Sequence, residues 1–113
     1  MSDRGQAAET LAAEYLTGHG LDILHRNFRC RFGEIDLIAR DGEALVFVEV
    51  RMRGRGDFGG AAESITAAKR ERLRKAAGFY LSGLRKTPPC RFDAVLISGT
   101  EGHIDWIRDA FGA

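Results

Sequence analysis

The segment that most constrains the fold is residues 33–51, GEIDLIARDGEALVFVEVR, which reads as two apolar strands joined by a tight turn. Asp41-Gly42, between the two apolar runs, is a strong hairpin signal. Glu34, Asp36 and Glu49 interrupt the apolar pattern at positions where a strand that is only buried carries Val, Ile or Leu. The segment therefore predicts a hairpin that holds carboxylates for a purpose other than packing.

The faces of this hairpin follow from its turn. A two-residue turn at Asp41-Gly42 places Asp36 opposite Phe47 and Glu34 opposite Glu49. Because side chains alternate along a strand, one side then carries the charged residues Glu34, Asp36, Glu49 and Arg51, and any even loop length preserves this. The other side is predicted to be the core face, formed by Ile35, Leu37, Val46, Val48 and Val50. Like charges that face each other destabilise a sheet, so we expect a metal ion or a basic side chain between Glu34 and Glu49.

The remaining segments complete an α/β order. Residues 3–18 have helical periodicity with one apolar face, formed by Ala8, Leu11, Ala12, Tyr15 and Leu16. A short strand is predicted from Ile23 to Arg29, and a Gly-rich, mobile segment over residues 54–63. Thr66 is the expected N-cap of a second helix that ends near Leu84, with the apolar face Leu73, Ala76, Ala77, Tyr80 and Leu84. Strands over residues 91–97 and 103–107, separated by a turn near residues 99–102, then predict a mixed β-sheet flanked by α-helices.

Length and composition limit the possible classes of protein. At 113 residues and 12.4 kDa the chain is expected to form one domain, residues 1–113, around a single core. It has neither a signal peptide pattern nor an apolar run long enough to cross a membrane, so we expect a cytoplasmic protein. Cys30 and Cys90 are far apart and show no metal-ligand spacing, which favours two reduced thiols.

Charge is unevenly distributed along the chain. Residues 1–50 carry 5 basic and 9 acidic side chains, whereas residues 51–86 carry 10 basic and 3 acidic ones. A basic block beside an acidic cluster suits a protein that grips phosphates and holds a metal, although a solvated Arg-rich helix face has the same composition. The candidate phosphate contacts in this block are Arg53, Arg55, Arg70, Arg72, Arg74 and Lys75.

The carboxylates of the hairpin permit two interpretations. In the first, Arg51 and neighbouring arginines neutralise them as surface ion pairs, each worth about 0–1 kcal/mol. In the second, Asp36 and Glu49 bind a hard divalent cation, Mg²⁺ or Mn²⁺, for which carboxylate oxygens are suitable ligands. The second is favoured because both residues lie inside strands, where a rigid backbone fixes their geometry.

Asp36 followed by Glu49-Val50-Arg51 resembles the signature of the restriction-endonuclease-like nucleases, an Asp and then Glu-x-Lys on the next strand. The whole chain resembles the YraN-like family of small, functionally uncharacterised bacterial proteins. The matching segments are AAETLAAEYL, GEIDLIARDG, LVFVEVR, the Lys69-Arg70 pair that starts the second helix, and RFDAVLI followed by WIRDAF.

That family is similar to the archaeal Holliday-junction resolvases, and the resemblance therefore implies a restriction-endonuclease-like fold and a homodimer. It also implies metal ligation by Asp36 and Glu49, with Glu9 of the first helix as a further carboxylate of the same site. Glu34 is an additional candidate ligand, although the broader nuclease signature does not require an acid at that place.

One position departs from the nuclease pattern, because Arg51 stands where those enzymes have lysine. Arginine can stabilise charge on a phosphate, but its pKa is too high for it to act as a base. Lys69 is the candidate assistant, since its helical position shares a face with Leu73 and Tyr80; a snorkelling surface lysine is the alternative.

We therefore expect a metal-dependent, endonuclease-like phosphodiesterase acting on DNA, with Asp36, Glu49, Arg51 and Lys69 as its catalytic residues. Two alternatives stay open. One is a nucleic-acid-binding module of the same fold that has lost catalysis, which Arg51 favours. The other is a scaffold protein in which the charges of the hairpin serve only as ion pairs.

Overall fold

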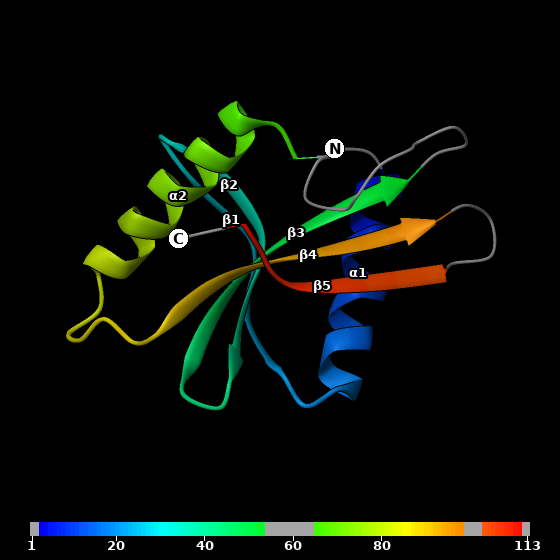
Figure 1. The fold of residues 1–113 in the computed structure, drawn as a ribbon, viewed down its shortest axis with the longest axis horizontal. Helices are drawn as coiled ribbons and strands as arrows, with labels where there is room; N and C mark the ends of the chain where they lie inside the picture. The colour runs from blue at the N-terminus through cyan, green and yellow to red at the C-terminus, as the bar shows by residue number, and fades with distance from the viewer. Residues whose placement is uncertain (1–2, 54–64, 99–102, 112–113) are drawn as a thin grey trace.

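The computed structural model describes residues 3–53, 65–98 and 103–111. The elements follow one another as α1 (Asp3–Gly18), β1 (Asp22–Cys30), β2 (Gly33–Asp41), β3 (Ala44–Arg53), α2 (Ala67–Ser82), β4 (Cys90–Ser98) and β5 (His103–Phe111). The strands form one five-stranded sheet in the order β1-β2-β3-β4-β5 (Figure 1). Strands β3 and β4 are parallel and joined through α2, while all other neighbours are antiparallel.

The two helices cover opposite faces of the sheet (Figure 1). Helix α1 packs through Ala8, Ala12 and Leu16, which are four residues apart and so lie on one face of the helix. Helix α2 packs on the other face through the buried residues Leu73, Ala76 and Ala77. The α/β class with a mixed sheet between helices, predicted from the sequence, is confirmed.

The predicted helices match the observed ones closely, with two corrections at their faces. Thr66 caps α2, because its hydroxyl accepts the backbone N–H of Lys69 at 3.1 Å. Leu84 is 39 % exposed because it lies beyond the C-cap of α2, and Leu11 is 43 % exposed because it lies at the flank of the apolar stripe of α1. Residues 54–63 and 99–102, predicted as a mobile segment and a turn, lie outside the described residues. No helix in the described ranges is both long and apolar enough to cross a membrane.

The register of the β2–β3 hairpin differs from the predicted one. Asp41 pairs with Ala44 and Leu37 with Val48, so the two loop residues are Gly42 and Glu43 rather than Asp41 and Gly42. Gly42 has φ +62, and Gly at the first loop position is the preference of a type II′ turn. Because the shift is an even number of residues, Asp36 and Glu49 still share a face, but they now lie across from each other.

The predicted core face of the hairpin is also incomplete, since both faces of the sheet are buried. Leu37, Val46 and Val48 pack with α1, whereas Ile35 packs in the cluster beneath α2. The cause is Asn27, which lies across from Asp36 and adopts a left-handed conformation with φ +54 that asparagine tolerates. Because of this bend, the side chains change sides of the sheet beyond Asn27 and Asp36. The end of the β1–β2 ribbon, by which we mean the two paired strands β1 and β2, therefore turns toward α2.

Candidate functional site

Asp36 is held where the pairing of β2 with β3 ends. The described backbone ladder stops at Leu37 and Val48, and Asp36 Oδ2 then accepts the backbone N–H of Val50 at 2.8 Å. In a continued ladder the N–H of Val50 would bond to the backbone of Ile35, and here the carboxylate of Asp36 accepts it instead. This contact fixes the carboxyl of Asp36 beside the next residue of β3 that faces α2, which is Glu49.

Glu49 is buried beneath the start of α2, with 4 % of its surface exposed. Lys69, in the first turn of α2, places Nζ 3.5 Å from Glu49 Oε2. The other oxygen, Oε1, is buried and has no hydrogen-bond partner in the described part of the chain. The prediction that Lys69 points toward the sheet is confirmed, and half of the Glu49 carboxylate is left without a partner.

The electrostatics of the pair follow from this burial. Loss of solvent, and next the charge of Asp36, raise the pKa of Glu49 to about 8, against the opposing effect of Lys69. Burial also raises the pKa of Asp36, and the hydrogen bond from Val50 opposes the rise. Burial and the charge of Asp36 therefore favour a proton or another cation on Glu49.

Two further acids border the pair. Burial, followed by the charge of Asp36, raises the pKa of Glu9, and Oε1 of Glu9 is also buried without a partner among the described residues. Glu34 is more exposed and forms a 3.2 Å ion pair with Arg29 Nε across the β1–β2 ribbon. No three His, Cys, Asp or Glu side chains within the described ranges are placed to hold one metal ion together. Glu9 and Glu34 are thus neighbours of the Asp36–Glu49 pair.

The comparison with known proteins gives a family. The model of the uncharacterised protein family UPF0102 matches residues 8–97, which contain all four acids and Lys69. The chain belongs to the UPF0102 family. A UPF0102 protein of Nitrosospira multiformis is 59% identical and covers 96% of this chain and 92% of its own length. UPF0102 proteins of Nitrosomonas europaea and Methylobacillus flagellatus are 57% and 52% identical, over 96% and 100% of this chain and 93% and 100% of their own lengths.

The predicted resemblance to an uncharacterised bacterial family is thereby confirmed. Arg51, at the position of the nuclease lysine in this UPF0102 chain, lies two residues beyond Glu49 in β3 and is partly buried. No contact between described residues joins its guanidinium to Asp36 or Glu49. Lys69, and not Arg51, is the cation that touches the carboxylate pair.

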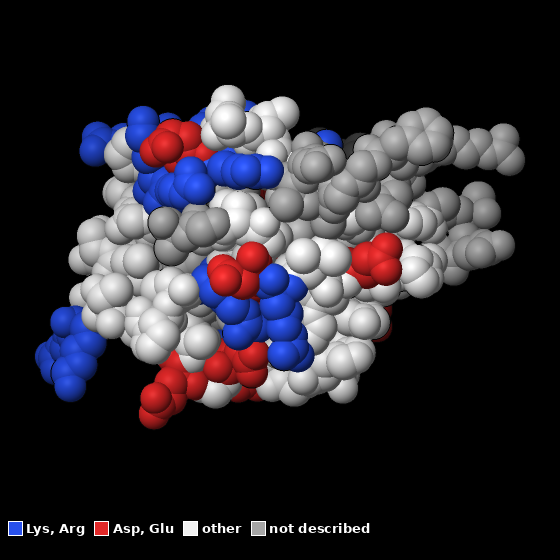
Figure 2. All heavy atoms as spheres, in the orientation of Figure 1, with Lys and Arg blue, Asp and Glu red and all other residues white. Residues whose placement is uncertain are grey.

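The basic residues of the UPF0102 chain divide into two groups. Arg72 and Lys75 are exposed on α2, and Figure 2 shows Lys and Arg side chains gathered over this helix. The guanidinium groups of Arg70 and Arg74 instead lie 5.7 and 5.8 Å from the ring centre of Phe111. The side chain of Arg74 is therefore only partly solvated, with 36 % of its surface exposed. Arg53 ends β3 and its side chain is not described, and Arg55 lies outside the described residues.

The sequence interpretation missed a second buried carboxylate, Asp93 of β4, which has no exposed surface. It accepts hydrogen bonds from Arg91 Nε at 3.0 Å, Trp106 Nε1 at 2.9 Å and the backbone N–H of Asp109 at 2.9 Å. Arg91 also contacts Asp41 at 2.9 Å. The sequence feature that could have identified Asp93 is that it is a single acid inside the apolar run RFDAVLI. Arg91, Trp106 and the N–H of Asp109 all bond to Asp93, and Arg91 also bonds to Asp41. We therefore interpret Asp93 as the residue that links β5 and the β2–β3 turn to β4.

Proposed function

We propose that this UPF0102 protein is a metal-dependent phosphodiesterase that hydrolyses nucleic acid, with DNA as the expected substrate. The observation that carries the proposal is the Asp36–Glu49 pair, in which Glu49 is buried and Asp36 half-buried. Glu49 contacts Lys69 through one oxygen, and its other oxygen has no partner among the described residues. Two adjacent carboxyls with raised pKa values, one of them buried beneath a lysine, are a costly arrangement that packing alone does not require.

The donor chemistry of the pair fits a hard divalent cation. Its ligands would be carboxylate oxygens of Asp36 and Glu49, which suit Mg²⁺ or Mn²⁺, and Mg²⁺ commonly uses one or two carboxylates and fills its other positions with water and phosphate oxygens. A bound cation would oppose the rise in both pKa values, because its charge favours the ionised carboxylates and it competes with the proton on Glu49. Glu9, with its own buried oxygen, borders this position.

The reaction is hydrolysis of a phosphodiester, in which water adds to phosphorus and the alcohol oxygen of the leaving strand departs with a proton. Asp36 and Glu49 would hold the divalent cation, which when bound would neutralise charge that develops on the phosphate and lower the pKa of water. Lys69, whose Nζ lies 3.5 Å from Glu49 Oε2, would donate hydrogen bonds to the attacking water and to a phosphate oxygen beside the pair, and so stabilise negative charge. Arg51 adds a permanent positive charge near the same end of β3.

One observation favours a second candidate, a nucleic-acid-binding module of the same fold without catalysis. Lysine is absent at position 51, and Lys69 forms its ion pair with Glu49, which reduces its availability to a substrate. In this alternative the exposed cations of α2 still hold phosphates.

The deciding experiment is cleavage of single-stranded, duplex and branched DNA with Mg²⁺ or Mn²⁺ by the native protein and by Asp36→Asn. We expect cleavage that needs the metal and is lost in the variant. Glu14→Gln, which removes an exposed carboxylate of α1, is the matched control and should retain activity. Cleavage that persists in Asp36→Asn would place the active site elsewhere, and binding of DNA without cleavage by any form supports the binding module.

A further inference from the structure

A group of aromatic rings lies at the surface where the end of the β1–β2 ribbon meets α2. Phe79 of α2 is 46 % exposed, and its ring centre lies 6.1 Å from that of Phe32 and 6.4 Å from that of Phe28. Helix α2 and the β1–β2 ribbon are in close contact here: a Cβ added to Gly33 would lie 3.7 Å from Cβ of Arg72. Phe79 is thus a large apolar side chain that the fold leaves open next to a second ring.

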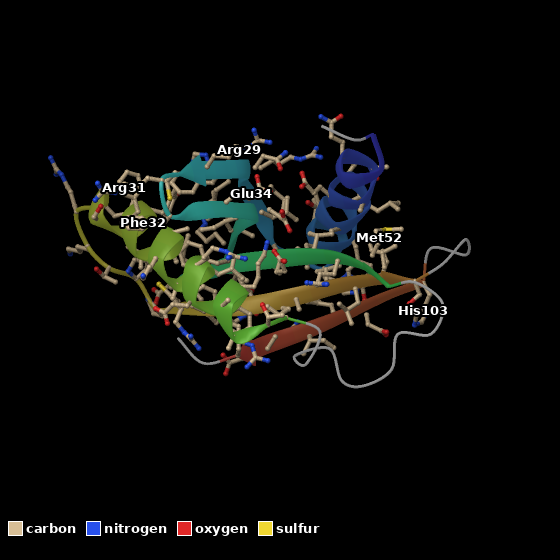
Figure 3. The ribbon with its side chains drawn as sticks, turned by 90° about the horizontal axis from the view of Figure 1, so that it is seen from above. Arg29, Arg31, Phe32, Glu34, Met52 and His103 are labelled. Atoms are coloured by element: carbon tan, nitrogen blue, oxygen red, sulfur yellow. The ribbon has the colours of Figure 1, made fainter. Side chains whose placement is uncertain are left out.

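Cations surround these rings. The guanidinium of Arg31 lies 4.8 Å from the ring centre of Phe32. Arg72 and Lys75 are exposed and precede Phe79 by seven and four residues, so they lie on the same stripe of α2. Figure 3 shows Arg31 and Phe32 at the end of the ribbon beside α2. We call Phe32, Phe79, Arg31, Arg72 and Lys75 the aromatic–basic surface.

The aromatic–basic surface has an excess of unpaired positive charge. Neither Arg31, Arg72 nor Lys75 forms an ion pair with another described residue. The nearby acids are already engaged, since Glu34 pairs with Arg29 at 3.2 Å and Glu71 with Arg74 at 3.9 Å. A ligand that matches this surface therefore combines negative charge with flat, apolar faces.

We propose that the aromatic–basic surface binds a single-stranded segment of nucleic acid. Unpaired bases stack on Phe79 and Phe32, and the phosphates between them contact Arg31, Arg72 and Lys75. Stacking on aromatic side chains beside a basic track is the usual way in which proteins hold single strands, whereas a duplex hides the faces of its bases.

This inference rests on the proposed function, and it narrows the substrate to nucleic acid with an unpaired strand beside the cut. Two elements lead from the rings to the carboxylate pair. Along β2, four residues separate Phe32 from Asp36, which is roughly 13 Å of strand. Along α2, ten residues separate Phe79 from Lys69, which is about 15 Å of helix. A strand held on the rings can therefore reach the pair without crossing the molecule.

The test is fluorescence anisotropy with a 5′-fluorescein-labelled 20-nucleotide strand and with the corresponding duplex, in EDTA so that no metal is bound and no cleavage occurs. Phe79→Ala should weaken single-strand binding by about 5- to 150-fold, the range for loss of one stacked base. Duplex affinity should change by less than about twofold. Phe79→Trp should restore the affinity, because it restores the flat aromatic face.

The matched control is Leu11→Ala, which removes an exposed apolar side chain from α1 on the other face of the sheet. It should leave both affinities unchanged. Urea unfolding of each variant establishes that it is folded, and Phe79→Trp keeps the test valid if the alanine variant fails to fold. Light scattering of the native protein and Phe79→Ala shows whether the rings hold a second copy of the chain.

Equal single-strand affinity in Phe79→Ala and the native protein would overturn the inference, as would an equal loss on both DNA forms. Loss of self-association in Phe79→Ala with unchanged single-strand binding would also overturn it and make the surface an interface between copies. Absence of any DNA binding by the native protein would remove the proposed function together with this inference. Ring-dependent single-strand binding without cleavage in Mg²⁺ or Mn²⁺ would sustain the inference and remove the catalytic proposal alone.

Discussion

Lys69 Nζ lies 3.5 Å from Glu49 Oε2, so the start of α2 places a cation on a carboxyl buried in the sheet. The hairpin sequence requires such a cation, because it puts acids together on one side of two paired strands. The lysine contacts one oxygen of Glu49 and leaves Oε1 without a partner among the described residues, while Asp36 is stabilised by the N–H of Val50 and by the charge of Lys69. A site that is only half neutralised in this way has measurable consequences for stability and for metal binding.

Glu49→Gln should change how stability depends on pH. A carboxyl whose pKa is raised by folding binds more protons in the folded state, so the free energy of unfolding falls as pH rises from about 4.5 to about 8. At about 1.4 kcal/mol per unit of pKa, the loss is a few kcal/mol. Removing the charge should abolish most of this loss and make the variant more stable than native at pH 8. Urea unfolding at pH 5 and pH 8 measures it.

The control for this experiment is Glu14→Gln, which changes an exposed glutamate and should keep the native pH dependence. If native protein and Glu49→Gln lose stability equally between pH 5 and pH 8, folding does not raise the pKa of Glu49. The argument for a cation at the pair would then lose its main support.

Mn²⁺ or Mg²⁺ should bind the native protein more tightly at pH 8 than at pH 6, because the metal competes with the proton on Glu49. Isothermal titration calorimetry at both pH values measures this. Asp36→Asn with Glu49→Gln should abolish binding and leave the protein folded. Glu9→Gln and Glu34→Gln should weaken it less, because these acids border the pair. Equal metal binding in the double variant would place the metal elsewhere.

The carboxylate site was largely accessible from sequence because it depends on local rules. Alternation along β2 and β3 puts Asp36 and Glu49 on one face whatever the even length of the loop, and Thr66 identified the start of α2. The predicted cross-strand pairs were wrong because Asp-Gly fits the turn in more than one position. In the structure Gly42 occupies the first loop position. Local sequence does not distinguish these two registers.

Other features depend on contacts between distant segments. The bend at Asn27 sends Ile35 beneath α2, and a strand pattern contains no indication of it. The stacking of Arg70 and Arg74 on Phe111 joins α2 to the last described residue of the chain, and helical position alone does not reveal this contact. Asp93 was visible as an acid in an apolar strand, but two of its donors, Trp106 Nε1 and the N–H of Asp109, come from β5.

Arg51→Lys should keep or raise the rate of DNA cleavage, because it restores the lysine of the nuclease pattern at unchanged charge. Arg51→Ala should lose stabilisation of charge on the phosphate. Lys69→Ala should be more severe, since Lys69 is the cation in contact with the pair, and loss of such a group costs about 100- to 1000-fold in rate in other enzymes. Single-turnover cleavage assays compare the three. A silent Lys69→Ala would show that the lysine serves only to stabilise Glu49.

Asp93→Ala should destabilise the protein strongly without changing the carboxylate pair. It leaves Trp106 Nε1 and the N–H of Asp109 without their acceptor and leaves Arg91 with Asp41 alone, and each unsatisfied buried donor costs about 1–3 kcal/mol. Asp22→Ala removes an exposed 3.1 Å ion pair with Arg40 and should cost about 0–1 kcal/mol. Urea unfolding measures both, and equal losses would contradict the role of Asp93 as an anchor.

DNA binding should weaken steeply with salt, because each phosphate contact releases condensed counterions and contributes about −0.9 to the log–log slope on duplex DNA. The structure predicts which cations contribute. Arg72→Ala and Lys75→Ala should each make the slope shallower, because both side chains are exposed on α2. Arg70→Ala and Arg74→Ala should leave it nearly unchanged but reduce stability, because these guanidinium groups pack on Phe111. Anisotropy titrations across a series of salt concentrations measure each slope. If the four slopes fall equally, the division of α2 into phosphate-facing and packed cations is wrong, and a slope of zero in the native protein would favour the scaffold alternative.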